Sequence, residues 1–289
     1  MLTIFSTPKP FDGHIGTIQR NAIRSWTLLR PRPQIILFGK DRGAAETAAE
    51  LGIVHVRDVR VSKFGTPLLS DMFAQAQQMA EHELICHVNA DIILMGSLYQ
   101  AVELLREQCG KVLMFCSPWL LPVEQEIVGS PDWEAQLHQR VKTSGQPPKL
   151  MGVDTFLFPR GFFDQMPPFA VGRTAQDNWL LHRACHAPFP AVDGSRFVLS
   201  VHQAHAGSTH YGNYEINAEV QRNRRLAGWW ARSFVAEDLP YVLTEDGQLL
   251  RKGVVERLRP RLRAVYSPVA IHLLNLTYTV RHKMGLYRR

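Results

Sequence analysis

The segment from Leu84 to Leu94 constrains the fold of this chain more than any other. A largely apolar run ends in a short polar turn, Asn89 to Asp91, and the sequence then becomes apolar again. Short apolar runs are typical of strands that are buried on both faces of a parallel sheet. Ligands of such sheets bind beyond the carboxyl ends of the strands. The segment therefore predicts a buried parallel strand whose polar turn lies where a ligand would bind.

Strand-like and helix-like segments alternate through the first half of the chain, and the intervening stretches carry apolar residues at helical spacing. This alternation predicts an α/β fold with a mostly parallel sheet and helices on both of its faces. The predicted strands are Leu2–Ser6, Gln34–Gly39, Ile53–Val56, Leu84–Val88 and Lys111–Cys116.

The second half is less regular. The stretch that begins at Ser117 indicates a long surface excursion before a helix from about Asp132 to Val141. No linker clearly divides the chain before about Leu239, so we expect one domain over residues 1–238 and a C-terminal extension over residues 239–289. Further elements are predicted as strands at Gly152–Phe158 and Arg196–Val201 and as helices at Gln176–His186 and Tyr214–Trp230.

The formal net charge of +7 is concentrated in the tail. Residues 251–289 hold ten Lys and Arg and one acidic residue, whereas the other 250 residues carry 23 basic and 25 acidic groups. Because the body is nearly neutral, no nucleic-acid partner is expected. The tail also contains an apolar stretch between Val269 and Val280. It suits either a peripheral contact with an anionic membrane surface or a helix packed on the domain.

The four cysteines are scattered without a CxxC pair, which favours reduced thiols over a zinc knuckle or a disulfide framework. The N-terminus lacks the basic and long apolar regions of a signal peptide. We therefore expect a cytoplasmic protein, and a tail that contacts a membrane would place it at the inner face.

Polar residues also follow the first two predicted strands. Ser6, Thr7 and Lys9 suit contact with a nucleotide base or phosphate, although a Pro-rich turn gives the same composition. Asp41 suits a uracil imide or a ribose hydroxyl. It equally suits the N-cap of the helix that follows.

Asp91 and a later run of histidines are the candidate metal ligands. His202, His205 and His210 lie within nine residues, next to Gly, Ser and Thr. Imidazole and carboxylate groups together suit Mn²⁺ or Mg²⁺ if this loop folds back onto the polar turn. A zinc site is the competing metal interpretation, and a loop of hydrogen-bonded histidines is the structural one.

Two further carboxylates require an explanation. Asp154 lies in an otherwise apolar predicted strand, where an unpaired charge is costly. Asp177 lies at the start of a predicted helix, where it suits either an N-cap or a general base held in place by Asn178 and Trp179.

These segments, in this order, resemble the nucleotide-sugar-dependent glycosyltransferases of the GT-A fold over roughly residues 1–230. In that family a Rossmann-like half ends in a metal-binding DXD motif, whose counterpart here is Asn89-Ala90-Asp91. An Asp near the start of a later helix is the catalytic base of inverting members, and Asp177 takes that position. A His after a late strand often completes the metal site, which implies His202 or His205.

The resemblance implies a metal-dependent glycosyltransferase with Mn²⁺ or Mg²⁺ as cofactor. It would move a sugar from a nucleotide-diphosphate sugar, a UDP-sugar by default or a GDP-sugar, to a hydroxyl of a glycan or lipid-linked acceptor. The implied site comprises Asp177 as catalytic base; Ser6, Thr7, Lys9, Asp41, Asn89 and Asp91 at the donor; Asp154 and Trp179 at the acceptor; and Asp91, His202 and His205 at the metal.

Two residues depart from the family pattern. Asn89 replaces the first carboxylate of the DXD motif, which removes one negative charge from the metal site. Gln176 precedes Asp177 where the family has an acidic residue. Without Asp177 as base, the enzyme would be a retaining transferase in which the departing diphosphate takes the proton.

Two alternatives belong to other functional classes. A nucleotidyltransferase that makes an activated sugar has a similar sheet, but a Gly-rich phosphate loop is lacking after the first predicted strand. A non-catalytic protein that binds a nucleotide or a membrane surface is the other alternative, and the Asn at position 89 suits it.

Overall fold

The computed structural model describes residues 1–127, 129–148, 152–205, 218–232 and 234–253. The helices are α1 (Gly13–Leu28), α2 (Ala44–Leu51), α3 (Leu69–Met79), α4 (Ser97–Cys109), α5 (Trp133–Ser144), α6 (Gln176–Cys185) and α7 (Ala218–Ala231), with a short 3-10 turn at Ala236–Asp238. The strands are β1 (Leu2–Ser6), β2 (Gln34–Phe38), β3 (Val54–Val56), β4 (Leu84–Val88), β5 (Ile92–Leu94), β6 (Met114–Cys116), β7 (Trp119–Pro122), β8 (Thr155–Pro159), β9 (Val192–Asp193), β10 (Ser200–Ala204), β11 (Tyr241–Leu243) and β12 (Leu249–Arg251).

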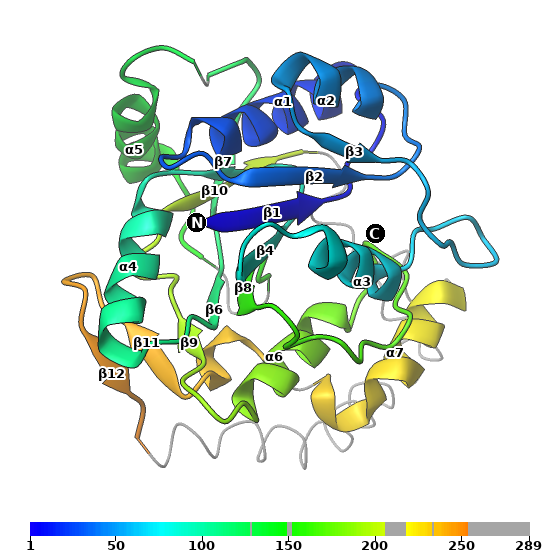
Figure 1. The fold of residues 1–289 in the computed structure, drawn as a ribbon. Helices are drawn as coiled ribbons and strands as arrows, with labels where there is room; N and C mark the ends of the chain where they lie inside the picture. Colours follow the sequence, from blue (N-terminus) through cyan, green and yellow to red (C-terminus); the bar gives the residue numbers. More distant parts are fainter. Residues whose placement is uncertain (128, 149–151, 206–217, 233, 254–289) are drawn as a thin grey trace, which may run out of the picture.

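The larger sheet has nine strands in the order β12-β11-β9-β6-β8-β4-β1-β2-β3. Strand β1 lies between β4 and β2 and is parallel to both, and β2 is parallel to β3. Strand β8 runs antiparallel to both of its neighbours, β4 and β6. Strand β9 lies between β6 and β11 and is parallel to both. The predicted α/β fold with a mostly parallel sheet is therefore confirmed (Figure 1).

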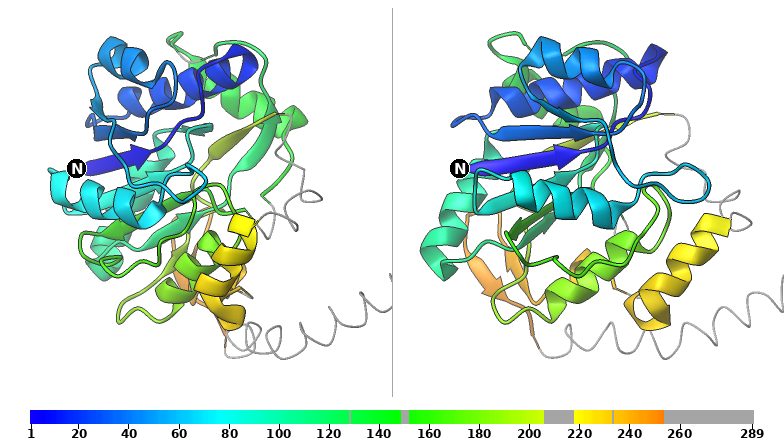
Figure 2. Two further views of the ribbon diagram at one scale, coloured as in Figure 1. Left: turned by 90° about the vertical axis from the view of Figure 1, so that its right-hand side faces the viewer. Right: turned by 45° about the vertical axis from the view of Figure 1, so that its right-hand side comes forward.

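Helices cover both faces of this sheet because the side chains of its strands alternate between two apolar layers (Figures 1 and 2). Ile4 and Cys86 lie in the layer shared with α1, α2 and α4. Phe5 and Ile85, their neighbours along the strands, lie in the layer shared with α3 and α6. Strands β1 and β4 are buried on both faces and consist largely of apolar residues, as such strands require.

A second, three-stranded sheet has the order β5-β10-β7 and was not expected. The predicted surface excursion after Ser117 is wrong over β7, because Trp119 to Pro122 pairs in parallel with β10. The chain after the polar turn also forms a strand, β5, which runs antiparallel to β10. The register sets His202 opposite Ile92, so β10 carries the predicted histidines to the turn that precedes β5.

The end of the described chain continues the larger sheet. Strands β11 and β12 lie beyond residue 239, and β11 pairs with β9, while the division into residues 1–238 and 239–289 stays a prediction. The predicted basic helical tail and its membrane contact fall mainly on residues 254–289, outside the described residues. Within the described ranges, no helix has the length and apolar character needed to span a membrane.

Gln203 in β10 fixes the two sheets against α1. Its side chain is fully buried, and its amide Nε2 donates to the carbonyl oxygens of Ile18 at 2.7 Å and Asp91 at 3.0 Å. Its Oε1 accepts from Asn21 Nδ2 at 3.0 Å. One buried amide therefore joins a helix, a strand and the polar turn.

Replacing Gln203 by Ala is expected to lower the free energy of unfolding by about 2 to 4 kcal/mol, because buried polar groups lose their partners and a cavity forms. Urea denaturation followed by circular dichroism measures this change. The matched control is Gln139→Ala on the exposed face of α5, which should change stability by less than about 0.5 kcal/mol. Equal effects of the two substitutions would contradict this role for Gln203.

Candidate active site

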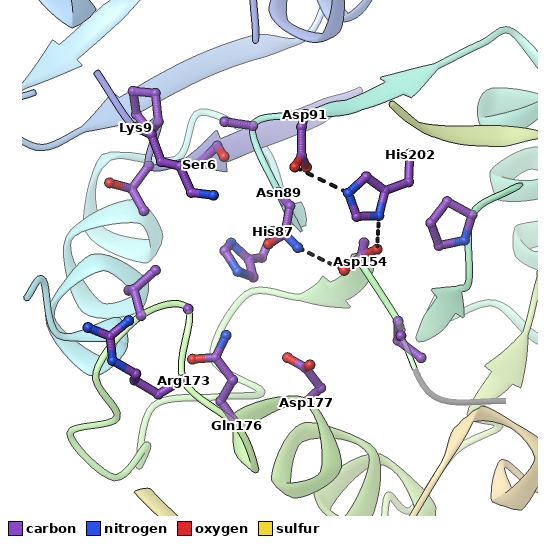
Figure 3. Close-up of a pocket in the computed structure, with 18 of the residues that line it drawn as sticks. Ser6, Lys9, His87, Asn89, Asp91, Asp154, Arg173, Gln176, Asp177 and His202 are labelled. Atoms are coloured by element: carbon purple, nitrogen blue, oxygen red, sulfur yellow. Dashed lines mark hydrogen bonds and ion pairs between the residues drawn. The ribbon is translucent and has the colours of Figure 1, made fainter. Parts of the chain in front are cut away.

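One pocket lies at the carboxyl ends of β1 and β4, and ten of the eleven residues predicted for the site line it. Segments far apart in the sequence meet there, including the turn after β4, the start of α6 and the end of β10. Figure 3 shows how their side chains surround the open space. The ten residues are Ser6, Thr7, Lys9, Asp41, Asn89, Asp91, Asp154, Asp177, His202 and His205.

Asp91, His202 and His205 form a compact group of possible ligands. Asp91 Oδ2 lies 3.3 Å from His202 Nε2 and 3.0 Å from His205 Nε2. One ligand atom from each residue lies within 4.8 Å of the other two. His202 and His205 therefore lie beside the polar turn, as predicted for the histidine segment. The third histidine, His210, lies outside the described residues.

Asp91 Oδ1 is buried without a hydrogen-bond partner, and His202 Nε2 is buried in an ion-pair contact with Asp91 Oδ2 that does not form a geometric hydrogen bond. Leaving such atoms unpaired is costly, so their arrangement favours a bound cation. A carboxylate with two imidazoles is a donor set that suits Mn²⁺ and, with added oxygen ligands, Mg²⁺. The residues present thus fit a divalent metal ion.

The electrostatics of the group also favour a positive charge between its members. Burial by itself would raise the pKa of Asp91, but the two imidazoles outweigh it and hold that pKa well below its usual range. Burial likewise disfavours the imidazolium of His202, yet Asp154 and Asp91 raise the pKa of His202 to about 10. A proton on His202 therefore supplies the positive charge when no metal ion is bound.

Asp154 contacts both the polar turn and the side of the His202 ring that faces away from Asp91. Its Oδ1 accepts from Asn89 Nδ2 at 2.7 Å, and its Oδ2 lies 3.5 Å from His202 Nδ1 (Figure 3). Metal-binding histidines commonly have a carboxylate at their second nitrogen, which fixes the ring orientation. The charge of Asp154, unexpected in an apolar segment, is thus paired, and both of its oxygens are engaged.

Asp177 lies on the first turn of α6, and its side chain projects into the pocket opposite Asp154 (Figure 3). The N-cap interpretation does not apply, because α6 begins at Gln176 and Ala175 takes the cap position. Burial, and then the charge of Asp154, raise the pKa of Asp177 to about 7. A carboxyl group with that pKa is suited to accept a proton near neutral pH.

Ala175 enters α6 with φ of 78°, a left-handed conformation that costs energy for a residue with a Cβ atom. It is the one non-glycine residue with positive φ in the described part of the chain. Backbone strain of this kind tends to occur at functional sites. Here it sets the direction in which Gln176 and Asp177 leave the loop.

The predicted donor residues lie at the ends of β1 and β2. Ser6 Oγ donates to the carbonyl oxygen of Val88 at 2.6 Å, and Thr7 Oγ1 donates to that of Phe38 at 2.8 Å. Their hydroxyl oxygens are therefore left to accept from a ligand. Asp41 lines the same end of the pocket, where burial raises the pKa of its carboxyl group. It is not the N-cap of α2, because Gly43 occupies that position.

Trp179 is the one predicted site residue that does not line the described pocket. Its indole packs in the apolar layer beside Phe169 and Phe163, with ring centroids 5.7 and 6.3 Å away. The acceptor role of Trp179 therefore stays a prediction that the packing of its indole does not support. The helical rotation that directs Asp177 into the pocket directs Trp179, two residues later, toward the core.

Sequence reasoning missed several polar residues of the pocket wall. His87 in β4 and Thr174 and Gln176 before and at the start of α6 all line the pocket. The only sequence signal for His87 was a histidine within an otherwise apolar strand. Gln176 was noted only as a departure from a motif.

No protein-family model matches the sequence, and no curated protein matches it. Solved structures do show a likeness. A mannosyltransferase from Pyrobaculum calidifontis, in complex with GDP-Man and Mn²⁺, is similar over 72% of this chain and 58% of its own length, with 10% identity and a TM-score of 0.45. TarS from S. aureus is similar over 70% of this chain and 36% of its own length, also with 10% identity and a TM-score of 0.45.

The glucosyl-3-phosphoglycerate synthase of M. tuberculosis is similar over 56% of this chain and 58% of its own length, with 15% identity and a TM-score of 0.35. The three solved structures are 10 to 15% identical to this chain, with TM-scores of 0.45 or lower. This chain spans little more than half the length of the first of them, and about a third of the second. The likeness concerns the fold and assigns no residue role.

Replacing Asp91 by Asn is expected to weaken Mn²⁺ binding by about 100-fold or more. The substitution removes the negative charge of the carboxylate that contacts both His202 and His205. Isothermal titration with MnCl₂ measures the affinity, and a parallel titration with ZnCl₂ tests the competing metal. Asp132→Asn is the matched control, since Asp132 is exposed and lies outside this group. Equal Mn²⁺ affinity in the two variants would remove Asp91 from the metal site.

Proposed function

We propose that this protein is a divalent-metal-dependent glycosyltransferase that moves a sugar from a nucleotide-diphosphate sugar to a hydroxyl of a glycan or lipid-linked acceptor. The observation that carries the proposal is the meeting of a metal-binding group, Asp91 with His202 and His205, and a raised-pKa carboxyl, Asp177, in one pocket. That pocket lies where ligands of α/β sheets bind. A UDP-sugar is the proposed donor, with a GDP-sugar as the competing choice.

Asp91, His202 and His205 would hold the metal ion, and Mn²⁺ suits this mixed nitrogen and oxygen set better than Mg²⁺ does. A bound divalent ion supplies charge neutralisation for the diphosphate that leaves. Asp154 keeps the His202 ring in position through Nδ1 and leaves Nε2 available to the ion. We therefore assign Asp154 to the support of the metal site rather than to the acceptor.

The donor nucleotide would lie along the ends of β1 and β2. The hydroxyl oxygens of Ser6 and Thr7 are placed to accept from N–H groups of a base, since their own protons are directed at strand carbonyls. Asp41 can accept from a ribose hydroxyl or an imide. Lys9 lines the pocket beside Ser6 and offers a cation to a phosphate (Figure 3).

Asp177 would act as the base. Its carboxylate accepts the proton of the acceptor hydroxyl while that oxygen forms a bond to the anomeric carbon. The bond between the anomeric carbon and the diphosphate oxygen breaks at the same time, and the nucleoside diphosphate leaves with its electron pair. Direct displacement of this kind inverts the anomeric centre, so the position of Asp177 favours an inverting enzyme over a retaining one.

The decisive experiment is isothermal titration of the folded protein with UDP and with GDP, first with Mn²⁺ and then with EDTA. Binding of one diphosphate that Mn²⁺ promotes and EDTA abolishes is the expected result. Absence of binding to both would contradict the proposal and favour a non-catalytic protein. Release of pyrophosphate from UTP or GTP in the presence of sugar 1-phosphates would instead favour the nucleotidyltransferase alternative.

The rate of transfer is expected to depend on pH through Asp177. Since its pKa is raised to about 7, the carboxyl group is protonated at lower pH and cannot accept a proton. Activity should therefore reach half of its maximum near pH 7 and level off only at higher pH. Asp177→Asn should lose about 10² to 10⁴ in kcat and lose this pH step, whereas Asp132→Asn should keep both. Unchanged activity in Asp177→Asn would favour the retaining alternative.

A further inference from the structure

His87 is a buried histidine in the floor of the pocket that the mechanism above does not use. It lies in β4, its side chain is almost fully enclosed, and it lines the same pocket as Asp91 and Asp177. Its Nδ1 is buried and has no hydrogen-bond partner. In Figure 3 its ring lies below the turn at Asn89 and faces Gln176 across the pocket.

The surroundings of His87 are those of a phenylalanine. Its ring centroid lies 4.9 Å from that of Phe5, 5.3 Å from Phe73 and 5.8 Å from Phe156. Burial lowers the pKa of His87 to about 4 and outweighs a hydrogen bond with the Phe5 backbone that raises it, so the imidazole is neutral at physiological pH. A fourth phenyl ring, among those of Phe5, Phe73 and Phe156, would fill this site without burying an unpaired nitrogen, so apolar packing does not explain the histidine.

Two more unpaired polar atoms line the same pocket. Thr174 Oγ1 and Gln176 Oε1 are buried without hydrogen-bond partners, at the entry to α6. None of these three side chains carries a charge at neutral pH, so they suit uncharged polar groups rather than phosphates. A ligand with several hydroxyl groups is the class that would pair all three.

We propose that His87 is a substrate-binding residue whose Nδ1 hydrogen-bonds a hydroxyl of the sugar that is transferred. This inference rests on the proposed function. The sugar must lie between the diphosphate, held near Asp91, and the base Asp177, and His87 lies on the floor between these two groups (Figure 3). Thr174 and Gln176 would pair further hydroxyls of the same ring.

The test is His87→Phe in the full-length protein, with two measurements. Thermal unfolding without nucleotide should show equal or higher stability than the wild type, because an unpaired nitrogen is replaced by an apolar ring. Competition binding with Mn²⁺ should show that UDP and GDP bind as before. The affinity of UDP-glucose, UDP-N-acetylglucosamine or GDP-mannose, relative to the matching diphosphate, should fall about tenfold for the sugar nucleotide that the wild type prefers.

His87→Gln, which keeps a hydrogen-bonding group, should recover part of that preference. Cys86→Ala is the control on the opposite face of β4, where it faces the other apolar layer; it should lower stability and leave the preference unchanged. A marked loss of stability in His87→Phe overturns the proposal, as does an unchanged preference in both His87 variants. Failure of the wild type to bind UDP or GDP would count against the proposed function, and the stability measurement would still decide whether the histidine serves packing.

Discussion

The candidate site depends on the antiparallel pairing of β5 with β10. This pairing sets His202 opposite Ile92, the residue after Asp91, and so brings together two ligands from opposite halves of the chain. The buried amide of Gln203 reinforces it by donating to the carbonyl oxygen of Asp91, 112 residues away. A slip of one residue would turn His202 to the opposite face of the strand, so burial of Val201 and Gln203 fixes the geometry of the metal group.

Asp154 acts electrostatically on both His202 and Asp177. The amide nitrogen of Asn89 donates to Asp154, which places a carboxylate beside the turn from the segment before β8. Position 89 itself carries no negative charge, and the carboxylate of Asp154 supplies one within hydrogen-bonding distance of it. The same carboxylate raises the pKa of His202 and, after burial, that of Asp177. Its charge thus acts on His202, a possible metal ligand, and on Asp177, the proposed base.

The sequence predicted the parts of the fold that local patterns determine. Strands β1, β2 and β4 have apolar runs long enough to be recognised in the sequence. Ligands of α/β sheets bind beyond the carboxyl ends of the strands, so the polar residues that follow these strands were predicted to line the pocket, and Ser6, Asp41 and Asp91 do line it. The short strands β5, β7 and β9 were missed, since segments of two to four residues form strands only through distant partners. Gln203 and His87 were missed for a related reason: a polar residue in an apolar strand gives no sign of what it contacts. The direction of the Trp179 side chain depends on the rotation of α6, which the sequence alone does not fix.

The cost of burying polar groups separates what serves the fold from what serves a ligand. Ten buried side-chain atoms in the described part of the chain have no hydrogen-bond partner, and five of them belong to residues that line this pocket. The left-handed backbone conformation of Ala175 and the raised pKa of Asp177 are two further unfavourable features of the same region. Each feature lowers stability, and each would be avoided by an apolar residue or a glycine. Their concentration at the ends of β1 and β4 is therefore best explained by a ligand that supplies the missing partners: a cation at Asp91 and His202, and uncharged polar groups at His87 and Gln176.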